Sequence, residues 1–526
     1  FYYIMNNNIF KLSLFFLISF LLLSPTVIIL FKGLSSLNTS GNLYASRYIL
    51  GSAKLVFLVS FIVVLISVPL AWVNTMTNFW GRRVIQVFCI FPLGVPAYIS
   101  AYAYAELLEP GGYLSLLFFS YEGFSLRNNF FGSLILSLSL FPYVYLLTRI
   151  AIINFSARYI EAAKTMGKGP FECFLRVCLP MALPGIAAGL ALALMETIND
   201  FGVADFFGLQ TLTLGVFQYI SIINDLPSAF LLSLIILIMM IALYIFEQSV
   251  RGKKKFHNSS YENVEWSRYQ LGKLKGALVL FLGGLPIIFG FIIPLFFTFY
   301  LFLLHIDKLD YSNYLSSLSN SFLVGSCVGL LCIFISIFIN FYSRFSKKLW
   351  VIYYKKIINL GYALPGVVIS LGVLILLSNF SKISSFSFSA TAFGLILALV
   401  IRLIAISNNS IDSGLEKVGK SIDDASRLIG RRPSTTYFRV IIPQVRLSIL
   451  AGFLLVFVDT VKELPITLLL RPFNFNTLAT SLYEYSSNEM FEYGSLHALT
   501  IIIFLSFVIY LFDRAIENKL VSKIKK

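Results

Sequence analysis

Runs of about 20 consecutive apolar residues recur along the whole chain, and they constrain its fold more than any other feature. Such a run is long enough to cross a bilayer as a helix. Only 13% of the 526 residues are charged, against roughly 25% in soluble domains. Because lipid offers the backbone no hydrogen-bond partners, we expect an all-α integral membrane protein. The twelve candidate segments lie at 9–32, 47–73, 85–108, 129–153, 181–200, 228–248, 277–304, 318–343, 357–378, 389–411, 444–464 and 495–512.

The positive charge of the chain indicates how it is oriented. A net charge of +16 would suggest nucleic-acid binding in a soluble protein. In a membrane protein an excess of Lys and Arg marks the cytoplasmic side instead. Threading twelve helices from a cytoplasmic N-terminus places most of the 41 Lys and Arg residues on that side. We therefore predict a multi-pass membrane protein with both termini in the cytoplasm and no nucleic-acid partner.

Two polar segments repeat each other at an offset of 263 residues. Island 1, EAAKTMGKGPFECFLRVCLP, occupies 161–180, and island 2, DASRLIGRRPSTTYFRVIIP, occupies 424–443. Each island follows the fourth apolar segment of its half, and an even number of spans per half indicates a parallel repeat about a pseudo-twofold axis. We predict two six-helix halves, 1–250 and 277–526, joined by a basic cytoplasmic linker, 251–276.

The islands share a local pattern of helix, stop and restart. Helix-forming residues precede Gly167, which suits the left-handed residue that ends a helix. Pro170 suits the first turn of the next helix. Gly430 and Pro433 repeat both features. Because the same pattern occurs at the same place in both halves, we favour docking elements for a partner over simple connectors.

At these residues the chain resembles the ABC importer permeases of the type I fold. The signature is their EAA loop, which here reads Glu161-Ala162-Ala163 with Gly167 and Pro180. In island 2, Asp424 replaces the glutamate and Ser426 replaces the second alanine. The resemblance implies that each island is a coupling helix seated in one of two copies of an ABC ATP-binding subunit. The implied coupling residues are Glu161, Ala162, Ala163, Gly167, Asp424, Ala425 and Gly430.

The same resemblance implies the remaining partners and the location. A periplasmic or lipoprotein substrate-binding protein would dock outside a bacterial inner membrane, with 109–127, 201–227 and 465–494 as candidate contacts. The fusion of two permease halves, together with the stretches 92–104, 196–219 and 362–372, resembles the ferric-iron branch of these importers. Thiamine, a polyamine or a phosphonate stays open as an alternative cargo. An ion-gradient secondary transporter, which would not need docking islands, is a further alternative.

Four acidic residues near the ends of the fifth spans are candidates for the translocation path. Glu196 and Asp200 are four residues apart and are expected to share a helix face. Asp459 and Glu463 repeat the pair in the second half. Carboxylate oxygens suit hard cations, and acidic residues at membrane depth favour a functional role. The alternative is that these residues pair with Lys or Arg across the bundle.

The rest of the sequence argues against an enzyme. A GxxxxGK[ST] match, GLEKVGKS at 414–421, follows a predicted membrane helix and not the strand that a phosphate loop requires, and there is no HExxH motif. ATP hydrolysis is therefore expected on a partner chain. Cys173 and Cys178 lack His or acidic residues at ligand spacing, and the spacing of Tyr98 and Tyr102 is more typical of aromatic packing than of metal ligands. We expect no cofactor, and the sequence does not identify a metal site.

Overall fold

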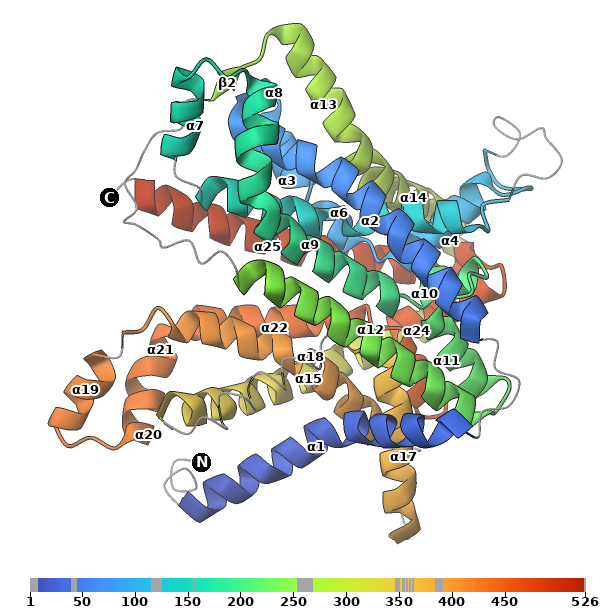
Figure 1. The fold of residues 1–526 in the computed structure, drawn as a ribbon. Helices are drawn as coiled ribbons and strands as arrows, with labels where there is room; N and C mark the ends of the chain where they lie inside the picture. Colours follow the sequence, from blue (N-terminus) through green and yellow to red (C-terminus); the bar gives the residue numbers. More distant parts are fainter. Residues whose placement is uncertain are drawn as a thin grey trace. The chain divides into compact units, whose positions relative to one another are not determined.

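The helices of this protein group into two compact units in a computed structural model (Figure 1). The model describes residues 8–38, 45–114, 125–154, 157–252, 268–345, 351, 355, 358, 361, 364–383, 391–419 and 421–524. Unit 1 contains Phe1–Leu43, Val216–Leu237 and Tyr311–Ser481, and unit 2 contains Tyr44–Gly215, Ile238–Asp310 and Leu482–Lys526. Each unit therefore combines segments from both sequence halves. The predicted halves, 1–250 and 277–526, were defined by the sequence repeat and not by packing, so their boundaries stay a prediction. Most of the predicted linker, 253–267, lies outside the described residues.

Unit 2 is built on a bundle of α2, α6 and α9, the second, fourth and fifth apolar segments of the first half. Its elements are α2 (Ala45–Met76), β1 (Thr77–Asn78), α3 (Arg82–Phe88), η3 (Phe91–Gly94), α4 (Ala97–Leu108), α6 (Asn129–Asn154), α7 (Ala157–Thr165), α8 (Pro170–Cys173), η4 (Phe174–Cys178), α9 (Leu179–Asn199), α10 (Gly202–Phe206), β2 (Tyr269–Gln270), α13 (Lys273–Ile287), η5 (Ile288–Ile292), α14 (Ile293–Leu304), η6 (Ile306–Lys308) and α25 (Phe491–Ile524). The two short strands pair in parallel, Thr77 opposite Tyr269.

Unit 1 repeats this bundle with α15, α18 and α22. Its elements are α1 (Asn8–Ser35), η2 (Ser36–Asn38), α15 (Tyr311–Phe345), α17 (Gly366–Ile383), α18 (Ala392–Leu415), α19 (Ser421–Leu428), α20 (Pro433–Thr436), η9 (Tyr437–Ile441), α21 (Ile442–Gln444), α22 (Arg446–Val461) and α23 (Pro465–Leu470). Three helices continue from one unit into the other, namely α11 (Leu212–Ser221), α12 (Leu226–Gly252) and α24 (Leu478–Ser487).

The first span of each half packs on the third span of the other half. In unit 1, α1 packs against α17, and in unit 2, α14 packs against α4. The close helix crossings of the two bundles also repeat. A Cβ on Gly189 of α9 would lie 2.6 Å from the Cα of Val144, and one on Gly452 of α22 would lie 3.3 Å from the Cα of Ser407. Small residues at such crossings let membrane helices approach closely.

The described helices confirm the membrane-protein class. Eight of them are long and apolar enough to cross a membrane, or ten if each bent pair counts as one span. The bent pairs are Arg82–Gly94 with Ala97–Leu108, at 92°, and Pro433–Gln444 with Arg446–Val461, at 73°. The other two predicted segments appear among the described residues as shorter apolar helices, Phe20–Ser35 and Gly366–Lys382. For these two segments the prediction of a full span stays a prediction.

Candidate functional site

Island 1 forms two short helices joined by a left-handed glycine, as predicted. Helix α7 ends at Thr165, Gly167 has φ +75°, and α8 begins at Pro170. The amide of Gly167 donates to the carbonyl of Lys164 at 2.9 Å, and the amide of Lys168 donates to that of Ala163 at 3.0 Å. These two bonds form the Schellman motif that satisfies the last carbonyls of a helix.

Island 2 forms the same structure residue for residue. Gly430 has φ +72°; its amide bonds the carbonyl of Arg427 at 2.9 Å, and the amide of Arg431 bonds that of Ser426 at 3.0 Å. Pro433 begins α20. In both islands a five-residue π-helix follows, at Phe174–Cys178 and at Tyr437–Ile441. The repeat is therefore structural as well as sequential.

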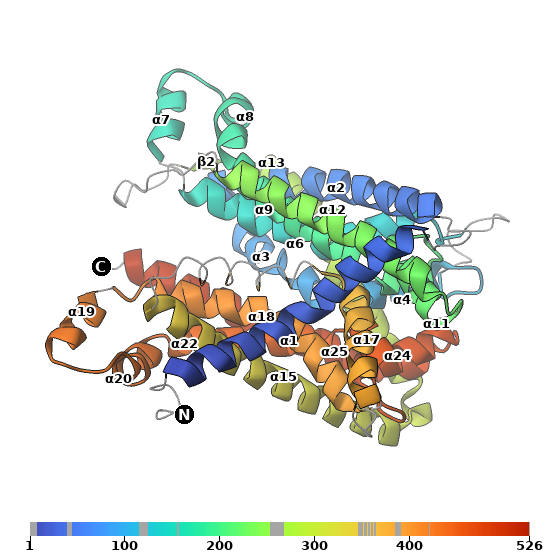
Figure 2. The ribbon, with the colours of Figure 1, turned by 60° about the horizontal axis from the view of Figure 1, so that its bottom comes forward.

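The tip of each island exposes large apolar side chains. Met166 is 71% exposed in island 1; in island 2, Leu428 is 89% exposed and Ile429 is 75% exposed. A Cβ added to Gly167 or Gly430 would meet nothing within 4 Å. Figure 2 shows each island as a pair of short helices at the end of its own unit's long helices. An exposed apolar tip beside an open glycine is a surface suited to insertion into a groove of another protein.

The predicted coupling residues occupy different positions around these short helices. Ala162, Asp424 and Ala425 are exposed, as are both glycines, whereas Glu161 is half-buried. Ala163 is buried. Exposure makes the first group available to a partner, while Ala163 packs inward and supports the helix. The coupling role of all seven residues stays a prediction.

A buried ion pair, which the sequence analysis missed, anchors island 2 to its unit. Arg344 at the end of α15 donates through Nε to Asp423 Oδ2 at 2.9 Å, and it also donates to the carbonyls of Leu415 and Val418 at 3.2 and 3.1 Å. The side chains of Arg344 and Asp423 are only 11% and 9% exposed. The corresponding residue of island 1 is the buried Ile160. The only feature of the sequence that pointed to this ion pair was a second aspartate, Asp423, directly before Asp424.

Island 1 is anchored through the end of the linker instead. The ammonium of Lys164 lies 4.3 Å from the centre of the Tyr269 ring, a cation–π contact. Burial, followed by the proximity of the Cys173 thiol, raises the pKa of the Tyr269 hydroxyl to about 12. This phenol is therefore neutral at physiological pH, and its contact with Lys164 involves the ring face.

The departure from the family pattern at Ser426 has a local explanation. Its hydroxyl forms a hydrogen bond with the hydroxyl of Thr436 on α20. The corresponding residues of island 1 are Ala163 and Cys173, both buried. A hydroxyl pair in island 2 thus replaces an apolar pair in island 1.

The candidate path carboxylates do not form the predicted helix faces. Helix α9 ends at Asn199, and Asp200 has an extended backbone with ψ 126°. Its Oδ1 accepts from the amides of Val203 and Ala204 at 3.0 and 3.3 Å, in the first turn of α10. Glu463 likewise follows α22, and its Oε1 accepts from Ile466 of α23 at 3.4 Å. Both residues occupy a helix N-terminus, where free amides favour a negative charge.

In unit 1 both path carboxylates are paired with cations. Glu463 lies 2.8 Å from Arg402 of α18, with both side chains buried, and Asp459 lies 2.6 Å from Lys462. An arginine inside an apolar segment is the sequence signal for such a partner. In unit 2, Glu196 is half-buried and Asp200 caps α10. The four residues belong to two units, so their convergence and their role in a path stay predictions.

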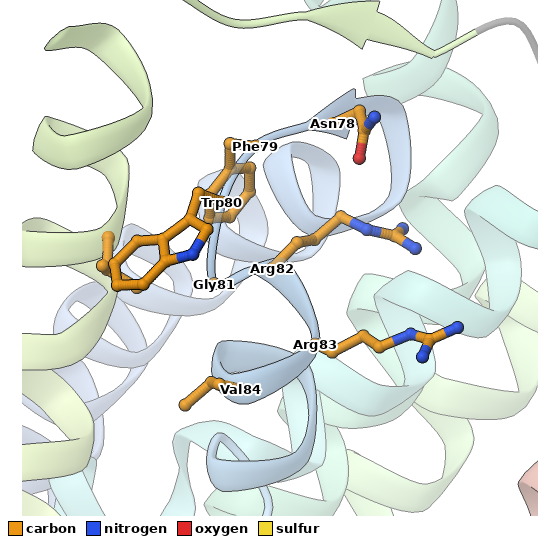
Figure 3. Close-up of a pocket in the computed structure, with 8 residues that line it drawn as sticks. Asn78, Phe79, Trp80, Gly81, Arg82, Arg83 and Val84 are labelled. Carbon is orange, nitrogen blue, oxygen red and sulfur yellow. The ribbon is translucent and has the colours of Figure 1, made fainter. Parts of the chain in front are cut away.

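The described residues do not include a group of three or more His, Cys, Asp or Glu side chains that could hold a metal ion. Cys173 and Cys178 are free buried thiols. A pocket opens at the turn between α2 and α3, and Trp80, Arg82 and Arg83 are among the residues that line it. Figure 3 shows the Trp80 side chain on one side of the turn and the two arginine side chains on the other.

The comparisons with known proteins agree with this geometry. The family described as binding-protein-dependent transport system inner membrane component matches the chain twice, at residues 63–252 and 333–522. Each match contains one island. Each match begins within the second span of its half and contains the whole of the fifth span.

Individual relatives carry different cargoes in their names. An Fe(3+)-transport system permease protein of Haemophilus influenzae is 23% identical over 452 residues, which cover 83% of each chain. A molybdenum transport system permease protein of the same organism is 26% identical over 30% of this chain and 71% of its own length. A probable sulfate transport system permease protein of Helicosporidium is 27% identical over 35% of this chain and 70% of its own.

Proposed function

Because the chain belongs to the family of binding-protein-dependent transport system inner membrane components, we propose that it is a permease subunit that supplies both transmembrane halves of an ATP-driven ferric-iron importer. The permease class follows from the family. The cargo, the number of ATPase subunits and the orientation are our proposal. The observation that carries it is the pair of islands, identical in backbone geometry and exposed at their tips.

The islands support coupling to two ATPase subunits. Island 1 continues through a π-helix into α9, and island 2 continues through a π-helix and α21, with a 73° bend before α22. A force on either island tip therefore reaches the fifth span of its half. Two equivalent tips suit two equivalent grooves. In the proposed cycle, ATP draws the ATPase pair together, both islands move, and the path opens outward to receive the cargo. Hydrolysis restores the inward-open state.

The basic residues support an orientation with the islands in the cytoplasm. In unit 2, Lys164, Lys168 and Arg176 belong to island 1, while Arg82 and Arg83 follow β1. Strand β1 pairs with β2, whose Tyr269 contacts Lys164, so these cations gather at one end of the unit. Positive residues at one end mark the cytoplasmic side.

Ferric iron is favoured by the extent of the similarity. The iron relative matches this chain over most of both lengths, as expected for two fused halves, whereas the molybdenum and sulfate relatives match about one third of it. In unit 2, the carboxylates of Glu196 and Asp200 at the end of the fifth span also suit a hard cation better than an oxyanion. Molybdate or sulfate is the second candidate cargo, because these relatives are similar within one half.

Reconstitution tests the proposal directly. The full chain, its ATPase and its binding protein would be placed in liposomes, and uptake would be measured with the binding protein offered Fe(III), molybdate, sulfate or thiamine. We expect ATP-dependent uptake of Fe(III) alone. Uptake of an oxyanion instead would overturn the cargo, and uptake that follows an ion gradient without ATP would overturn the importer class.

A further inference from the structure

One face of α4 carries oxygen atoms from the protein interior to its exposed end. Tyr98, Tyr102 and Glu106 follow one another at intervals of four residues, so they line one side of the helix. Tyr98 and Tyr102 are 5% and 2% exposed, whereas Glu106 is only half-buried. Glu106 interacts electrostatically with Glu492 in the first turn of α25 and with Glu489, which precedes that helix. The helix therefore connects an acidic surface of unit 2 with two buried phenols.

The buried end of this stripe meets two carboxylates and a third phenol, all in unit 2. The ring of Tyr102 packs edge-on against Phe206 of α10, with centroids 4.7 Å apart. The preceding residue, Asp205, accepts a hydrogen bond of 2.6 Å from the hydroxyl of Tyr483. Tyr102 interacts electrostatically with Asp205, Asp200 and Tyr483. The phenol of Tyr102 thus lies near these oxygen atoms, and its hydroxyl forms no hydrogen bond with any of them.

The hydroxyl of Tyr102 has no evident role in packing. It is buried and has no hydrogen-bond partner in the part of the chain that the structure describes. A buried hydroxyl without a partner lowers stability, and a phenylalanine of the same shape would avoid that cost. A retained buried polar group of this kind calls for a functional explanation.

The second repeat shows that the fold does not require these oxygen atoms. Helices α4 and α17 each begin directly after a proline, Pro96 and Pro365. Counted from that proline, the counterparts of Tyr98, Tyr102 and Glu106 are apolar, namely Val367, Leu371 and Ile375. At the 263-residue offset of the islands, Asp205 corresponds to Leu468, whereas Asp200 corresponds to the carboxylate of Glu463. The oxygen stripe belongs to one repeat only.

We propose that Tyr98, Tyr102, Asp200, Asp205 and Tyr483 form a transient binding site for the transported hard cation, which reaches it past Glu106. This inference rests on the proposed function and assigns the site to that cargo. Phenol and carboxylate oxygens are the donors that hard cations prefer. An oxyanion would need N–H donors, and the nearby Arg127 already donates to Glu109 at 3.1 and 3.2 Å.

The site is tested in the reconstituted complex by uptake of Fe(III) per ATP hydrolysed. Tyr102→Phe and Asp205→Asn are each expected to lower this ratio about 10-fold, as loss of a metal-site group typically does. The matched control is Tyr104→Phe, on the same helix, whose hydroxyl donates to the carbonyl of Phe289 at 2.6 Å. We expect the control to transport like the unaltered protein. Co-purification of the ATPase subunit with Tyr102→Phe checks that this variant folds and assembles.

The possible results distinguish a failure of the proposed cation site from a failure of the proposed iron-import function. If the unaltered protein imports Fe(III) and both variants keep the normal ratio, the site is wrong and the function stands. An equal loss of uptake in Tyr104→Phe would also overturn the site, because any loss of a tyrosine hydroxyl from α4 would then impair transport. If the unaltered protein imports only an oxyanion, both proposals fall. Repeating the assay with Ga(III), which is not reduced, should give the same pattern if the site binds the trivalent ion.

Discussion

Islands 1 and 2 have the same shape toward the outside and different supports on the inside. Both contain a glycine with φ near +75° (+75° and +72°), the same pair of capping hydrogen bonds and an exposed apolar tip. Inside, island 1 uses Ile160 and the contact of Lys164 with Tyr269, while island 2 uses the ion pair of Asp423 with Arg344. A surface that binds equivalent partners must keep its shape. Different contacts between an island and its own unit can support that same shape.

The ends of the fifth spans differ in the same way. Asp200 and Glu463 both cap the short helix that follows. Glu463 also has the buried partner Arg402, whereas the corresponding residue of the first half is Ser139. Both carboxylates thus accept hydrogen bonds from the short helix that follows, and in unit 1 the charge of Glu463 is also neutralised by Arg402. The repeat preserves geometry more strictly than chemistry.

The largest expected effect is the loss of coupling when both tips change. Gly167→Asp with Gly430→Asp should abolish ATP-driven uptake, because a new charge enters the apolar tip and a side chain is placed on the left-handed backbone that glycine adopts freely. Co-purification of the ATPase subunit measures the loss, which should be smaller in either single variant.

Gly208→Asp is the matched control for this change. Gly208 also has φ +65° and open space around it, but it follows α10 and lies outside both islands. We expect it to keep normal ATPase binding. If the double variant binds the ATPase normally, the tips are not the docking elements.

The next effect concerns the support of island 2. Arg344→Met should lower the free energy of unfolding by about 3 kcal/mol, because it leaves Asp423 charged and buried without its partner. Thermal unfolding in detergent measures this loss. Adding Asp423→Ile, which copies Ile160 of island 1, should recover part of it. A stable Arg344→Met protein would show that the ion pair does not support the island.

A third prediction separates the two ends of the fifth spans. Asp200→Asn should slow iron uptake about 10-fold if this carboxylate touches the cation. Arg402→Gln with Glu463→Gln removes two opposite charges together and should leave uptake close to normal. The liposome assay measures both. Equal losses in the two proteins would mean that the repeats contribute alike.

The smallest effect concerns the hydroxyl pair of island 2. Ser426→Ala should cost about 1 kcal/mol, the net value of an ordinary hydrogen bond. Adding Thr436→Cys, which recreates the apolar pair Ala163 and Cys173, should return the stability of the unaltered protein. Thermal unfolding again gives the measurement. If the double variant is as unstable as Ser426→Ala alone, the hydroxyl pair and the apolar pair are not equivalent.

Much of the islands could be predicted because their signals are local. A glycine that ends a helix and a proline that begins one act through the backbone of neighbouring residues, so Gly167, Pro170, Gly430 and Pro433 were assigned correctly from sequence. The shared helix face of Glu196 and Asp200 was wrong. Its spacing was helical, but the chain leaves the helix at Asp200 to cap α10.

By itself, the sequence determined the membrane class, the internal repeat and the stop-and-restart geometry of both islands, since hydropathy, offset and turn residues are properties of short stretches. Only the tertiary structure decided which charges are neutralised and which helices pack together. Arg344 is 79 residues from Asp423, and Arg402 is 61 residues from Glu463. The first span of each half also packs on the third span of the other half. Such contacts depend on how distant helices meet, and no local pattern specifies that.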